Sequence, residues 1–120
     1  MNKERILKLA DVVERQKHAK VSDSHGFNMG EFRHECGTPS CIAGWACALK
    51  KRDKTGMKEI DIDVFSQAKK YLGLSAYEAD ELFIPSSGYW SLITPSQAAA
   101  TLRNLAETGE VVWNVEKVDG

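Results

Sequence analysis

The core of the fold is set by the stretch Cys36-Gly37-Thr38-Pro39-Ser40-Cys41-Ile42-Ala43-Gly44-Trp45-Ala46-Cys47-Ala48-Leu49, which contains all three cysteines of the chain. Thr38 followed by Pro39 combines a good helix N-cap with a residue suited to the first helical position. From Ile42 to Leu49 the residues are apolar or small and carry no charge, as in a buried helix. We therefore predict a central buried helix over residues 39–50.

Two cysteines fall at or just before the start of this helix. With Thr38 as the cap, Cys41 is the third helical residue, close to unpaired backbone N–H groups that favour a thiolate and lower the thiol pKa. Cys36 and Cys41 are therefore the candidate thiol site. No catalytic residue is assigned, since no histidine follows Cys41 as the base of a papain-like peptidase would. The structural alternative, Cys41 packed as a small apolar side chain, is the one we favour.

The same region offers weak evidence for a metal site. His25, His34, Cys36 and Cys41 can in principle supply four zinc ligands, but their spacing lacks a C-x-x-C knuckle. We therefore predict no bound metal and no cofactor, with both histidines at the surface. A reversible disulfide between Cys36 and Cys41 is a further alternative, because residues five positions apart across a turn can approach to bridging distance.

Four more helices follow from apolar periodicity and end signals. Asn2 caps a first helix that runs to about His18, and a third helix covers about residues 63–72 and ends at Gly73. Ser75 to Glu78 and Thr94 to Gln97 form capping boxes for helices over 76–83 and from 95 to Gly109. The β-branched and aromatic tail, 111–115, predicts a strand or docked extended segment, with the segment around Phe27 as its partner.

The composition predicts one mostly α-helical domain over residues 1–120, with about five helices and a small β element formed by the C-terminal tail. Residues 1–70 hold 14 basic and 10 acidic residues, a net charge of +4, whereas residues 71–120 hold 2 basic and 7 acidic residues, a net charge of −5. No apolar run reaches the roughly 20 residues of a membrane span. The odd cysteine count, without an export signal, predicts a cytoplasmic protein with reduced thiols.

Nucleic acid is an unfavoured partner. The segment from Phe65 to Phe83 resembles a helix-turn-helix in its turn chemistry, but the second helix carries Glu78, Asp80 and Glu81 and no basic residue, so phosphates would be repelled. The concentrated basic segment is Lys50 to Lys54, interpreted as a solvated loop.

The aromatic residues of the acidic half give a different candidate. Tyr89 and Trp90 lie in an irregular segment with proline, serine and glycine. We predict that this pair is the interaction surface, since exposed aromatic residues on loops are typical interface anchors.

The motif Cys-Gly-Thr-x-x-Cys-x-Ala-Gly-Trp at residues 36–45, followed by Leu72-Gly73-Leu74, Leu82-Phe83, Ile93-Thr94-Pro95, Ala98-Ala99 and Gly109, resembles small uncharacterised proteins of bacteriophage and prophage genomes. The resemblance implies an accessory or host-modulating protein and supplies no catalytic residues. The leading hypothesis is a non-enzymatic protein that binds a host or phage protein. The alternative is a small thiol- or metal-dependent enzyme centred on Cys36 and Cys41.

Overall fold

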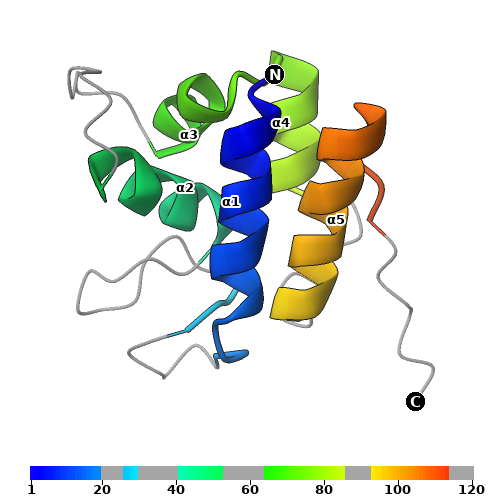
Figure 1. The fold of residues 1–120 in the computed structure, drawn as a ribbon. Coiled ribbons are helices and arrows are strands. Elements are labelled where there is room, and N and C mark those ends of the chain that lie inside the picture. Colours follow the sequence, from blue (N-terminus) through cyan, green and yellow to red (C-terminus); the bar gives the residue numbers. More distant parts are fainter. Residues whose placement is uncertain (20–25, 30–40, 53–63, 86–92, 114–120) are drawn as a thin grey trace.

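Helices α1 (Lys3–Glu14) and α5 (Pro95–Thr108) lie side by side and share the most extensive helix–helix contact of the fold (Figure 1). The computed structural model describes residues 1–19, 26–29, 41–52, 64–85 and 93–113. The buried face of α1 is the one expected from its periodicity: Ile6, Leu9, Ala10 and Val13. It packs against an α5 face made of small and leucine side chains: Ala98, Ala99, Leu102, Leu105 and Ala106.

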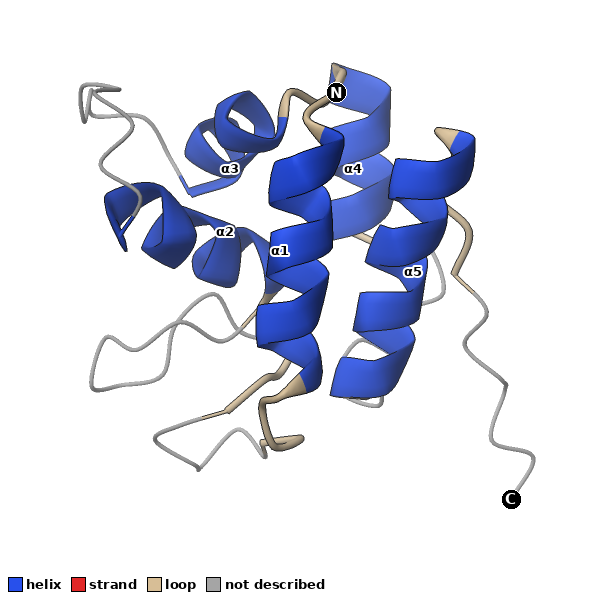
Figure 2. Cartoon of the chain, viewed as in Figure 1, coloured by secondary structure: helices blue, strands red, loops and turns tan. Residues whose placement is uncertain are grey.

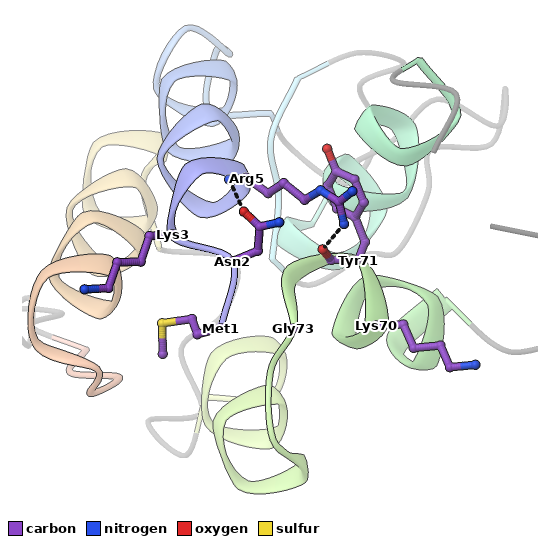
Figure 3. A pocket seen from close by; sticks show the side chains of 7 residues that line it. All are labelled: Met1, Asn2, Lys3, Arg5, Lys70, Tyr71 and Gly73. Carbon is purple, nitrogen blue, oxygen red and sulfur yellow. Dashed lines mark hydrogen bonds between the residues drawn. The ribbon is translucent and has the colours of Figure 1, made fainter. Parts of the chain in front are cut away.

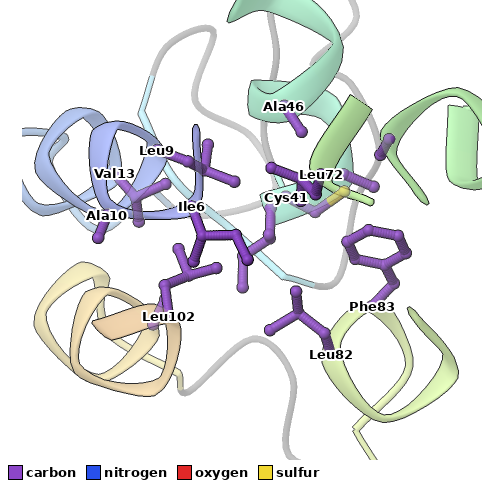
Figure 4. Packing of buried hydrophobic residues seen from close by; sticks show 14 of the residues in the cluster. Ile6, Leu9, Ala10, Val13, Cys41, Ala46, Leu72, Leu82, Phe83 and Leu102 are labelled. Carbon is purple, nitrogen blue, oxygen red and sulfur yellow. The ribbon is translucent and has the colours of Figure 1, made fainter. Parts of the chain in front are cut away.

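Helices α2 (Ile42–Arg52), α3 (Val64–Leu72) and α4 (Ala76–Phe83) complete a compact, mainly helical globule. α2 and α3 pack together, and each also contacts α1. Side chains from all five helices meet in one hydrophobic cluster (Figure 4). Within the described ranges, no helix is both long and apolar enough to cross a membrane.

Four helix ends that have local sequence signals are where we predicted them. Ser75 and Glu78 form a capping box at the start of α4, and Thr94 and Gln97 form one at the start of α5. Gly73 and Gly109 follow α3 and α5 with φ angles of +69° and +79°. Such left-handed conformations are easy for glycine and costly for other residues.

The end of α1 differs from the prediction, because the helix stops at Glu14 and not near His18. The chain turns there and pairs with the Phe27 segment: the Phe27 N–H donates to the Lys17 carbonyl at 2.8 Å and the Ala19 N–H donates to the Phe27 carbonyl at 2.9 Å. This makes an isolated parallel bridge between His18 and Phe27. A tertiary contact that local pattern does not reveal has therefore ended the helix.

The predicted β element in the C-terminal tail is not found in its described part. Residues 110–113 form no strand (Figure 2), and Phe27, the expected partner, pairs with His18 instead. The tail docks through side chains: the Trp113 indole N–H donates to the Glu81 carbonyl at 2.8 Å. Residues 114–120 lie outside the described residues.

Candidate functional site

Of the candidate thiol pair, the structure describes Cys41. Its carbonyl accepts the N–H of Trp45 at 3.0 Å, the first hydrogen bond of α2, so Cys41 is the N-cap of this helix. The Cys41 Sγ accepts the backbone N–H of Gly44 at 3.5 Å, which is what a capping side chain does. The predicted start of the helix at Pro39 is therefore wrong: α2 begins three residues later and Cys41 precedes its first turn.

The surroundings of Cys41 are those of the favoured alternative, a small side chain packed in the core, and not those of an activated thiol. Its side chain is 3% exposed and belongs to the same buried cluster as Leu72 and Phe83 (Figure 4). Desolvation by burial raises the pKa of the thiol and outweighs the hydrogen bonds from the backbone of Gly44 and Ala43, which lower it. A thiol in this environment is protonated at neutral pH and poorly suited to act as a nucleophile.

The other candidate residues for thiol or metal chemistry, His25, His34 and Cys36, lie outside the described residues. Cys41 and Cys47 are free, buried thiols. Across the described part of the chain, no cluster of three or more His, Cys, Asp or Glu side chains has the arrangement of a metal site.

The basic segment that begins at Lys50 is not a solvated loop at its start. Lys50 belongs to α2, is 5% exposed, and donates from Nζ to the Gln67 Oε1 on α3 at 3.4 Å. Arg52 is the last residue of the helix and is exposed. Residues 53–63 lie outside the described residues.

The described surface carries one aromatic residue whose exposure the sequence did not indicate. Tyr77, in the first turn of α4, is 75% exposed, and Ile84 after the last turn is 43% exposed. Residues seven positions apart lie two turns apart on one side of a helix, so Tyr77 and Ile84 share a face. Asp80, which is also exposed, lies between them. The predicted interaction residues Tyr89 and Trp90 lie outside the described residues.

A groove between α3 and α4 adjoins this face. It has a volume of about 270 Å³. Its lining includes Phe65 and Phe83, whose rings stack with centroids 5.6 Å apart. On the α4 side the lining includes two small side chains, Ala76 and Ala79. Asp80 and Lys69 add opposite charges to the lining of the groove. The groove can accept one large apolar side chain from another molecule.

Helices α3 and α4 with the turn at residues 73–75 have the layout of a helix-turn-helix. Glu78, Asp80 and Glu81 give α4 only negative charge, so it offers phosphates no attraction. Comparison with known proteins adds no other guide, because no family model, curated protein or solved structure matches the chain.

Proposed function

We propose that the protein is a non-enzymatic binding protein of the cytoplasm, and that it docks on a host or phage protein through the outer face of α4. The observation that carries the proposal is the 75% exposure of Tyr77 on an ordered helix, with Ile84 exposed on the same face. Large aromatic side chains dominate the energetics of protein interfaces. A helix that presents apolar anchors on one face, here at positions i and i+7, is a common recognition element.

The charges on this surface define the partner further. The exposed carboxylate of Asp80 lies between the two apolar anchors, and residues 71–120 have a net charge of −5. Electrostatic complementarity then requires a partner with basic residues around an apolar patch. An apolar side chain of that partner fits the groove above the stacked Phe65 and Phe83 rings.

The alternative function, an enzyme centred on Cys36 and Cys41, has less support. Cys41 is buried and its pKa is raised, and its sulfur already accepts the N–H of Gly44. The resemblance to phage and prophage proteins supports a host or phage partner. Tyr89 and Trp90 remain the interaction residues predicted from the sequence.

Site-specific photo-crosslinking tests the proposal. A photoreactive amino acid replaces Tyr77 in one variant and Glu107, an exposed residue near the end of α5, in a matched control, and both are expressed in the bacterial cytoplasm. We expect a discrete adduct of one partner protein from position 77 and no such adduct from position 107. Tyr77→Ala should then abolish co-purification of that partner without changing the melting temperature. Equal adducts from both positions, or capture that Tyr77→Ala leaves intact, would contradict the proposal.

A further inference from the structure

A second surface feature lies where the start of α1 meets the end of α3. It is a hollow of about 590 Å³, and its lining includes the cationic residues Lys3, Arg5 and Lys70. Among the described residues, no acidic side chain lines it. This hollow is separate from the α3–α4 groove and from the exposed face of α4.

Backbone contacts hold the two sides of the hollow together. The Asn2 N–H donates to the Leu72 carbonyl at 2.9 Å. At Gly73 a Cβ atom would lie 3.2 Å from the Asn2 nitrogen and 3.3 Å from the Met1 Cα, so only glycine allows this close approach without strain. The chain before α1 is thereby fixed against the turn after α3.

Arg5 is the positioned cation of the hollow. Its Nη1 donates to the Tyr71 carbonyl at 2.8 Å, and its Cζ lies 4.5 Å from the centroid of the fully buried Tyr71 ring (Figure 3). A guanidinium carries five N–H donors, and one carbonyl uses a fraction of them. The other N–H groups of the guanidinium, which these contacts hold in a fixed orientation, remain available to an anion.

Within the part of the chain that the structure describes, Lys3, Arg5 and Lys70 have no carboxylate within ion-pair distance. By contrast, Arg103 on the neighbouring helix contacts two carboxylates of α1, those of Asp11 and Glu14. These side chains, and not the end of the helix, supply the positive charge, because the Asn2 Oδ1 already caps α1 by accepting the Arg5 N–H.

We propose that this hollow binds a small di- or triphosphate anion. Lys3 and Lys70 extend on opposite sides of the contact between Asn2 and Gly73, with Arg5 reaching across Tyr71 (Figure 3). A chain of two or three phosphates offers more oxygen atoms to separate cations than a single phosphate does. Its three or more negative charges match the three cations, and each flexible lysine can turn inward to meet a terminal phosphate.

Titration of the 15N-labelled full chain with sodium tripolyphosphate tests the proposal, at constant ionic strength near 150 mM. We expect saturable shifts of the backbone amides of Asn2, Arg5 and Gly73. Orthophosphate should bind more weakly under the same conditions. A ten-nucleotide single-stranded DNA tests the other source of phosphate, and it should also bind more weakly, since its charges are spread along an extended backbone.

Two charge-matched variants separate a site from general attraction. Lys3→Gln and Arg15→Gln each remove one exposed cation of α1 or its C-cap, at opposite ends of the helix. Lys3→Gln should raise the Kd for tripolyphosphate about threefold to fivefold, and Arg15→Gln should leave it unchanged. Equal effects of both variants, shifts without saturation, or tighter binding of orthophosphate or the oligonucleotide would overturn the proposal.

Discussion

Trp113 docks the tail by donating a hydrogen bond to a carbonyl near the end of α4, that of Glu81, which has no backbone donor. In a continuing helix, the N–H of residue 85 would donate to the Glu81 carbonyl, but residue 85 is a proline and has no N–H. The Ile84 N–H already donates to the Asp80 carbonyl at 2.9 Å. The indole N–H of Trp113 therefore supplies, at 2.8 Å, the donor that the helix end lacks.

The substitution Trp113→Phe removes this donor and keeps an aromatic ring in place. The variant loses one hydrogen bond, worth about 0.5–1.5 kcal/mol, and leaves the partly covered Glu81 carbonyl without its donor. We expect a loss of about 1–2 kcal/mol in the free energy of unfolding, which lowers the melting temperature by several degrees, on the order of 4–8 °C per kcal/mol. The matched control is Val112→Ala, because Val112 is a neighbouring, exposed residue of the same segment.

Urea unfolding followed by circular dichroism at 222 nm measures this loss, and it avoids a fluorescence signal that the substitution itself would change. The control should unfold within about 0.5 kcal/mol of the unmodified protein. If Trp113→Phe unfolds at the same urea concentration as Val112→Ala, the hydrogen bond to Glu81 contributes nothing and the account of the tail is wrong.

Three further predictions concern the helices. Because burial raises the Cys41 pKa above its ordinary value of 9.0, the neutral thiol contributes to the free energy of unfolding fully below that pH, and this contribution is lost as the pH rises through the higher folded-state pKa. Cys41→Ser, which keeps a capping oxygen, should therefore lose less stability between pH 8 and 10.5 than the unmodified protein loses in urea titrations. Arg103 lowers the pKa of Glu14 by hydrogen bonding and charge, so Arg103→Gln should slightly destabilise the protein at pH 7. In thermal melts, the difference in melting temperature between the variant and the unmodified protein should vanish in 1 M NaCl, and also as the pH falls through and below the folded-state pKa of Glu14. Gly44 is buried in α2, so Gly44→Leu should overpack its surroundings and cost about 1–3 kcal/mol; an unchanged melting curve would show that no close packing occurs there.

The fold was predictable from the sequence where a helix end depends on neighbouring residues alone. Hydrogen bonds between residues a few positions apart form the capping boxes at Ser75 and Thr94 and the helix ends at Gly73 and Gly109. The local sequence is therefore enough to predict where these helices begin or end. The end of α1 was mispredicted because it depends on Phe27, which pairs with a segment about ten residues earlier. Periodicity cannot show which of two local conformations a distant partner will select.

The candidate site was less predictable because its chemistry depends on burial. Proximity to a helix start indicated backbone N–H groups near Cys41, but the pattern did not show that desolvation has the larger effect on the thiol pKa. Tyr77 is a comparable case. Its place on a short helix of mixed composition gave no sign that the side chain stays in solvent at 75% exposure. The cations of the hollow come from two segments that lie more than sixty positions apart in the sequence, and only the tertiary fold brings Lys70 to Lys3 and Arg5.

The two proposed surfaces have opposite charge, and the chain passes from one to the other through the turn that joins α3 to α4. Lys70 belongs to the hollow, and Asp80 belongs to the face of α4. Between them, the Glu78 carboxylate accepts the Ser75 N–H at 2.8 Å, so part of the negative charge nearest the hollow is already satisfied by the helix start. The surfaces can therefore act independently: Tyr77→Ala should leave the Kd for tripolyphosphate unchanged, and Lys70→Gln should leave capture of the protein partner unchanged. If both substitutions disturb both measurements, then the turn is the centre of one composite surface, and the separate assignments are wrong.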